Sequence, residues 1–269
     1  MAIRMKATVF LGGGRITSAL VAGLRLAGYR GEIVVYDRNP AKLQALRREA
    51  QVETARELKT AMLRAEMLIV AVRPESVAGI LDEIADCGVA PPKLCISLAA
   101  GIPLKNLRSR FRPAVHWVRA MPSPVCRVGR GLTALSFGRN VSKSERSQVH
   151  KFFGQVGAVV QITEKKFDAF TAVYSSSHGY HALATLAAAA EDAGLDRATA
   201  LSAAAHALGD GILYWRQSGK PVADLLREAA TPGGIAAATL SAMTASGYAR
   251  AVRNGIRAGL RQARSNAKR

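Results

Sequence analysis

The chain has 269 residues, of which 49% are apolar and 21% are charged, a balance typical of a folded protein and not of a disordered one. The formal net charge of +19 predicts a positive field that attracts anionic ligands. The basic residues are spread along the chain without interleaved aromatic residues, a pattern that argues against a specific nucleic-acid interface.

The three cysteines are Cys87, Cys95 and Cys126, an odd number without the paired spacing of a zinc site. Neither a disulfide framework nor a metal site is therefore predicted. The first residues lack a signal-peptide cleavage pattern, and no apolar run reaches the roughly 18 residues of a membrane span. These features favour a protein of the reducing cytoplasm that makes no membrane contact.

An apolar strand, a glycine turn and the start of an amphipathic helix follow one another in residues 7–17. This order is typical of a dinucleotide-binding fold. Gly12 permits a tight turn, and Gly14 lets a pyrophosphate approach the N–H groups at the start of a helix. The third small position of this fingerprint is Thr17. The predicted cofactor contacts in the turn are Gly12, Gly13, Gly14, Arg15 and Ile16.

A second apolar strand ends at Asp37, 23 residues after Gly14, near the expected position of a ribose-binding carboxylate. Arg38 and Asn39 follow it, and an arginine fork suits the 2′-phosphate of NADPH. Asp37 favours NADH instead. We expect Asp37 to turn away while Arg38 and Asn39 face the phosphate, so NADPH is the predicted cofactor and NADH the alternative.

Further strands and helices alternate up to residue 163. Helices are predicted over 40–49, from Pro74 and over 142–154, and strands over 66–72, 94–99, 114–121, 132–137 and 158–162. This pattern predicts an α/β fold with a doubly wound sheet and a dinucleotide-binding domain of residues 1–163.

Residues 164–269 lack strand patterns and predict an all-helical second domain. Helices are expected over 167–193, 197–218, 222–229 and 234–247 and from residue 248. Their alanine-rich faces favour close helix packing, including packing with a second copy, so at least a dimer is predicted. The basic segment 261–269 is expected to fray.

Several motifs, in their order along the chain, resemble those of the pyrroline-5-carboxylate reductases. They are Gly12-Gly-Gly14, Asp37-Arg-Asn39, Ala71-Val-Arg-Pro74, Ile96-Ser-Leu-Ala-Ala-Gly101, Arg119-Ala-Met-Pro122, Val128-Gly-Arg-Gly131 and Thr231-Pro-Gly-Gly234. The resemblance implies a Rossmann domain, a helical dimerisation domain and NAD(P)H-dependent reduction of a cyclic imine to proline. It also implies further cofactor contacts, at Ala71, Val72, Arg73, Pro74, Ala99 and Met121.

Three segments depart from that family's pattern. Met121-Pro-Ser-Pro-Val125 stands where the family reads Met-Pro-Asn-Thr-Pro. Tyr174-Ser-Ser-Ser-His-Gly-Tyr180 stands where it reads Ser-Gly-Ser-Gly-Pro-Ala-Tyr. Gly233-Gly-Ile-Ala236 replaces a run that ends in threonine and so loses a hydroxyl. In that family, these three segments hold the substrate and the nicotinamide. We therefore expect the fold to match the family more closely than the identity of the substrate does.

The resemblance implies that the substrate carboxylate lies against backbone N–H groups at the start of a helix after Gly233. The predicted substrate contacts are Ser123, Ser176, Pro232, Gly233 and Gly234. His178 and Tyr180 are the candidate catalytic residues, because a histidine near an imine nitrogen can donate a proton near neutral pH. The alternative for His178 is a polar residue that only begins a helix.

The sequence is compatible with three functions. The first is NADPH-dependent reduction of 1-pyrroline-5-carboxylate to proline, as in proline biosynthesis. The second is reduction of a different cyclic imino acid. The third is a noncatalytic NADP-binding homologue that acts as a sensor or an assembly partner, suggested by the lost threonine and asparagine.

Overall fold

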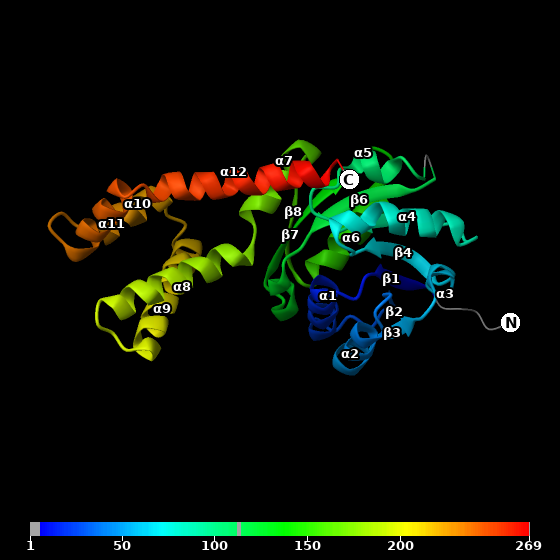
Figure 1. Cartoon of the computed structure of the whole chain (residues 1–269), viewed down its shortest axis with the longest axis horizontal. Helices are drawn as coiled ribbons and strands as arrows, with labels where there is room; N and C mark the ends of the chain where they lie inside the picture. The colour runs from blue at the N-terminus through cyan, green and yellow to red at the C-terminus, as the bar shows by residue number, and fades with distance from the viewer. Residues whose placement is uncertain (1–5, 112–113, 269) are drawn as a thin grey trace. The chain divides into compact units, whose positions relative to one another are not determined.

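The computed structural model describes residues 6–111 and 114–268 (Figure 1). The strands are β1 (Ala7–Leu11), β2 (Ile33–Tyr36), β3 (Glu53–Ala55), β4 (Ala65–Val70), β5 (Leu94–Ser97), β6 (His116–Met121), β7 (Gly131–Phe137) and β8 (Gly157–Gln161). The helices up to β8 are α1 (Arg15–Leu26), α2 (Pro40–Ala50), α3 (Leu58–Met62), η1 (Pro74–Ser76), α4 (Val77–Asp86), α5 (Leu104–Arg108), η2 (Pro124–Val128) and α6 (Lys143–Gly154). The later helices are α7 (Glu164–Val173), α8 (Ser176–Asp192), α9 (Arg197–Ser218), α10 (Val222–Ala229), α11 (Ile235–Ala245) and α12 (Tyr248–Asn266).

The strands form one eight-stranded sheet in the order β3-β2-β1-β4-β5-β6-β7-β8. All neighbouring strands are parallel except β6 and β7, which are antiparallel. The strand order reverses at β1, whose neighbours are β2 and β4, as in a doubly wound fold. The predicted α/β class, with a Rossmann-type sheet followed by a helical region, is confirmed.

Alternating side chains of the strands build a separate apolar core on each face of the sheet. Phe10 belongs to the core shared with α1, α2 and α6, whereas Val9 and Leu11 belong to the core shared with α3, α4 and α5. Successive side chains of a strand point to opposite faces, so a continuous apolar run fills both cores. This burial explains why the central strands lack a polar face.

The chain packs into two compact units, and the first contains both an early and a late segment. Residues 1–174 and 258–269 form the first unit, and Ser175–Arg257 form the second. The expectation that 261–269 frays is wrong for its described part, because α12 runs to Asn266. Asn266 Nδ2 donates to the Ala100 carbonyl at 3.2 Å, and Asn106 Nδ2 donates to the Ala267 carbonyl at 2.8 Å.

The single helix expected over 167–193 is two helices, α7 and α8. Tyr174 ends α7, and the Ser175 hydroxyl caps α8 by accepting from the Ser177 N–H at 3.3 Å. Serine favours such a cap over a helix interior. The short elements β3, α3 and α5 were not predicted, because three to five residues carry too little periodicity. Within the described residues, no helix is long and apolar enough to cross a membrane.

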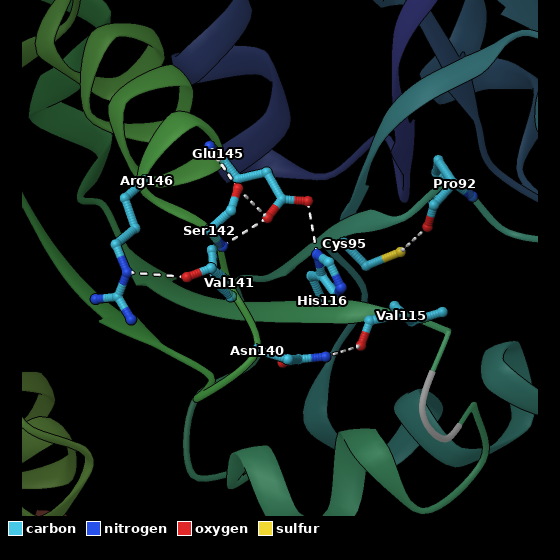
Figure 2. Close-up of polar contacts among 9 residues, drawn as sticks. All are labelled: Pro92, Cys95, Val115, His116, Asn140, Val141, Ser142, Glu145 and Arg146. Atoms are coloured by element: carbon cyan, nitrogen blue, oxygen red, sulfur yellow. Dashed lines mark hydrogen bonds and ion pairs between the residues drawn. The ribbon is translucent and has the colours of Figure 1, made fainter.

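Helix α6 is fixed to the sheet through Glu145 (Figure 2). The Ser142 hydroxyl accepts from the Glu145 N–H at 3.2 Å, while Glu145 Oε2 accepts from the Ser142 N–H at 2.7 Å. Glu145 Oε1 lies 2.7 Å from His116 Nδ1 at the start of β6. Burial raises the pKa of Glu145, but hydrogen bonds from Ser142 and His116 more than offset this, so its pKa lies below the ordinary value.

We predict that Glu145→Gln destabilises the fold by about 1 kcal/mol at neutral pH, because glutamine can keep the capping geometry but loses the negative charge that faces the Ser142 N–H and His116. A lowered pKa stabilises the folded state above the ordinary carboxyl pKa, and this stabilisation is lost as the pH falls through the folded-state value. The difference in urea midpoint between the variant and the wild type should therefore close below about pH 4. The exposed Glu49 on α2 supplies the control, Glu49→Gln, which should change little at either pH. A difference in urea midpoint that does not depend on pH would contradict a stabilising role of the ionised Glu145 carboxylate.

Candidate functional site

The predicted cofactor residues gather at one edge of the sheet. Strands β1, β2, β4, β5 and β6 are parallel, so their carboxyl ends meet at this edge. The turn at Gly12 follows β1, Asp37 follows β2, Ala71 follows β4, Ala99 lies two residues beyond β5, and Met121 ends β6. Ligands of open parallel sheets bind at this edge, near the point where the strand order reverses.

The glycine turn leaves room for a phosphate at the start of α1. Gly12 has φ +109°, and an added Cβ would lie 2.8 Å from the Ala71 carbonyl oxygen, so a side chain is excluded there. An added Cβ at Gly14 would meet no atom within 4 Å. No side chain caps α1, so no side-chain cap takes up the N–H groups of its first turn, which includes Arg15 and Ile16. The turn therefore fits the pyrophosphate of a dinucleotide.

Asp37 is turned into the glycine loop. Its Oδ2 accepts from the Gly13 N–H at 2.7 Å, and its Oδ1 accepts from the Asn39 N–H at 2.8 Å. The Asp37 side chain is only 12% exposed. With each oxygen bonded to a backbone N–H, Asp37 ties the ends of β1 and β2 together.

Arg38 and Asn39 lie on the outer side of this turn. The Arg38 side chain is 70% exposed and forms an ion pair with Glu83 of α4. Asn39 caps α2, with Oδ1 accepting from the Ala41 N–H at 2.9 Å. An exposed pair such as Arg38–Glu83 contributes roughly 0–1 kcal/mol, so a phosphate can displace Glu83 from the guanidinium.

The remaining predicted cofactor residues differ in exposure. Ala71, Val72, Pro74 and Met121 are partly buried, and Ala99 is buried. Arg73 is exposed, with its Nη1 3.8 Å from Glu75 Oε1. All of these residues lie at the carboxyl edge of the sheet. Their contact with a cofactor stays a prediction.

Ser123 is 4% exposed and directs its hydroxyl toward the protein itself. Its Oγ lies 3.1 Å from Tyr174 Oη and accepts from the Val125 N–H at 3.3 Å. Tyr174 Oη also accepts from the Leu132 N–H at 2.6 Å. No role of Tyr174 was predicted from sequence, although this residue begins one of the segments that depart from the family pattern.

Arg119 is a second residue whose role was not predicted. Its guanidinium is buried on β6, 3.0 Å from a carboxylate oxygen of Glu164 and 3.0 Å from one of Asp168. The same group lies 4.1 Å from the centre of the Phe167 ring. Arg119 therefore fixes α7 to the sheet near Met121. A charged residue inside an otherwise apolar strand was the signal, because a buried charge requires partners.

The other predicted site residues belong to the second unit. Ser176, His178 and Tyr180 lie in the first turns of α8, and His178 and Tyr180 are exposed. Pro232 and Gly233 lie in the turn before α11, and Gly234 is its N-terminal flanking residue, with no side-chain cap. The Gly234 N–H donates to the Thr231 carbonyl at 3.0 Å, which closes the turn.

Over residues 6–111 and 114–268, no group of three or more His, Cys, Asp and Glu side chains is placed to hold a metal ion.

We predict that Gly14→Asp weakens dinucleotide binding by roughly 100-fold or more, because it places a carboxylate where the pyrophosphate approaches. The open space at Gly14 makes Gly14→Ala the matched control. Both variants should keep the wild-type unfolding midpoint, which separates loss of binding from loss of fold. Unchanged cofactor affinity in Gly14→Asp, measured by fluorescence titration, would refute the location of the site.

We predict that Arg38→Ala raises the KM for NADPH about tenfold and changes the KM for NADH less than about twofold, because only NADPH carries the phosphate. Glu83→Gln should act in the opposite direction by releasing the guanidinium. Steady-state kinetics with both cofactors tests the pair of variants. Equal losses with both cofactors would show that Arg38 does not recognise the phosphate.

Comparison with known protein families identifies the two parts of the chain separately. Residues 8–101 match the family model described as NADP oxidoreductase coenzyme F420-dependent. Residues 164–266 match the family model for pyrroline-5-carboxylate reductase dimerisation. The second match begins at α7, next to the predicted domain boundary.

Curated relatives match nearly the whole chain. A pyrroline-5-carboxylate reductase of Mycobacterium tuberculosis is 31% identical, with 96% of each chain covered. One of Corynebacterium melassecola is 29% identical over 90% of this chain and 92% of its own. The structure of a Plasmodium falciparum pyrroline carboxylate reductase with NADP bound has the same fold, with a TM-score of 0.87 at 21% identity over 99% of this chain and all of that one. The identity shared over nearly the full length shows that the chain belongs to the pyrroline-5-carboxylate reductase family.

Proposed function

We propose that the protein is an oxidoreductase that uses NADPH to reduce the C=N bond of 1-pyrroline-5-carboxylate, which yields proline. The observation that carries this proposal is membership of the reductase family over 96% of the chain. The open glycine turn at the start of α1 supports it, because the turn fits the pyrophosphate of the cofactor.

The first unit supplies the cofactor site in this proposal. The N–H groups at Gly14, Arg15 and Ile16 hold the pyrophosphate, while Arg38 holds the 2′-phosphate after leaving Glu83. Bound NADPH supplies a hydride to the imine carbon. Met121, at the end of β6, lies at the same edge and helps to place the nicotinamide.

The second unit supplies the substrate site. The uncapped start of α11 at Gly233 and Gly234 binds the substrate carboxylate through backbone N–H groups, although Ile235 and Ala236 bring no hydroxyl. Ser176 and Pro232 complete this contact. His178 and Tyr180, exposed at the start of α8, are proposed to supply the proton that the imine nitrogen takes up on reduction.

Self-association is supported by the match of residues 164–266 to a dimerisation domain. We propose a dimer or a larger assembly. In the single chain, α9 leaves Leu213, Tyr214 and Trp215 exposed to between 43% and 53%, and large apolar side chains of this kind are often covered by a partner. The alanine-rich helices allow close approach of a second copy.

The cysteine side chains are compatible with a reducing compartment, and we propose the cytoplasm. Cys87, Cys95 and Cys126 are free thiols. Burial raises the pKa of the Cys126 thiol to about 11, so this thiol is not a ready nucleophile.

The decisive test is NADPH oxidation by the purified protein, followed by absorbance, with 1-pyrroline-5-carboxylate as substrate. A six-membered cyclic imino acid and an NADH reaction serve as comparisons. We expect turnover on the five-membered imine at roughly 1 per second or faster, the range of ordinary enzymes, with proline as the product.

Two other outcomes would replace the proposal. Turnover only on the larger ring would identify a reductase of a different imine, consistent with the lost hydroxyls at Ile235 and Ala236. Tight NADPH binding without turnover on either ring would identify a noncatalytic sensor or assembly partner.

A further inference from the structure

Two of the segments that depart from the family pattern meet in the structure. Ser123 stands where the family has asparagine, and Tyr174 stands where it has the first serine of Ser-Gly-Ser-Gly. Their hydroxyl oxygens lie 3.1 Å apart, although 51 residues separate them in sequence. Both residues belong to the first compact unit. The two substitutions therefore form one contact.

Each of these hydroxyls also accepts a hydrogen bond from the backbone. Tyr174 Oη accepts from the Leu132 N–H at 2.6 Å, and Ser123 Oγ accepts from the Val125 N–H at 3.3 Å. One of the two hydroxyls donates to the other across the 3.1 Å between their oxygens. Removal of the Tyr174 hydroxyl leaves the Leu132 N–H without this partner and the Ser123 hydroxyl without the tyrosine.

The pair is joined to the cofactor helix through η2. Ser123 is the N-terminal cap of η2. The Cys126 carbonyl of η2 lies so close to Gly23 of α1 that an added Cβ would overlap it. Arg127 Nη2 also donates to the Ser18 hydroxyl at 2.7 Å. The segment from Met121 to η2 is thus held at one end by the sheet and at the other by α1.

We propose that Tyr174 is a positioning residue, coupled to Ser123, that holds the segment after β6 in place for the nicotinamide end of the cofactor. In this proposal Ser123 hydrogen-bonds to Tyr174 and does not bind the substrate. Because their hydroxyls form one contact, we expect the effect of a change at either residue to depend on the other. The catalytic part of this inference rests on the proposed function, while the coupling itself does not.

The first test is a double-mutant cycle of Tyr174→Phe and Ser123→Ala, which removes each hydroxyl and keeps the surrounding side chains. We expect each single variant to lower kcat about tenfold and the double variant to lose clearly less than the product of the two factors, since both variants remove the same contact between the hydroxyls. The Kd for NADPH should change less than about twofold, because the glycine turn is untouched. Losses that multiply to about a hundredfold, or an unchanged kcat in Tyr174→Phe, would overturn the proposal.

A matched control removes a tyrosine hydroxyl elsewhere in the same unit. Tyr29 Oη lies 3.5 Å from the Thr8 hydroxyl and has no connection to η2 in the described contacts. Tyr29→Phe should leave kcat unchanged. A similar fall in kcat in this control would mean that general loosening of the unit explains the effect, and the proposal would fail.

Substitution of both residues by asparagine and serine, the residues of the family pattern, tests directly whether the effect of each substitution depends on the other. Ser123→Asn adds bulk at a buried position, and Tyr174→Ser leaves a void beside Leu132, so each alone should lower kcat at least about tenfold. The double variant Ser123→Asn/Tyr174→Ser should recover at least about half of the wild-type kcat. A double variant worse than both single variants would overturn the coupling.

Hydrogen exchange separates this inference from the proposed function. The Leu132 amide should exchange about tenfold faster in Tyr174→Phe, and exchange elsewhere in β7 should change less. This readout needs no substrate, so it stands even if the wild type fails to reduce 1-pyrroline-5-carboxylate. Unchanged exchange at Leu132 would mean that the contact does not hold the segment, and the proposal would fail.

Discussion

The close approach of Gly12 to the end of β4 is the constraint on which the rest of the site depends. The backbone turns there with φ +109°, against the carbonyl of Ala71, and leaves no room for a side chain. This contact places the start of α1 beside the point where the strand order reverses. The other predicted cofactor positions lie beside it, because parallel strands bring their carboxyl ends to the same edge.

Charges near this turn are divided between structure and binding. Asp37 bonds to two backbone N–H groups and holds the ends of β1 and β2 together. Arg38 stays exposed in a weak pair with Glu83. The buried Arg119, with its two carboxylate partners, is by contrast a structural element that fixes α7. Asp37 and Arg119 thus serve the structure, whereas the exposed Arg38 is the charge predicted to bind a phosphate.

Local patterns predicted most of the regular structure. The glycine turn, the apolar strands and helices such as α9 and α10 depend on residues close in sequence, and their bounds agree closely with the predictions. The break between α7 and α8 was missed, because alanine-rich flanks masked the capping preference of Ser175. The ordered end of α12 was missed as well. Its basic composition indicates a solvated tail, whereas Ala263 is buried and Gly101 lets the helix pack closely.

The sequence alone determined the fold class, the family and the positions at the glycine turn, because backbone conformation and apolar periodicity are properties of neighbouring residues. Only the tertiary structure decided which distant residues become partners. It joined Ser123 to Tyr174, Arg38 to Glu83 and Asn106 to the end of α12. Each of these contacts spans at least 45 residues, and no local pattern encodes which surfaces will pack against one another.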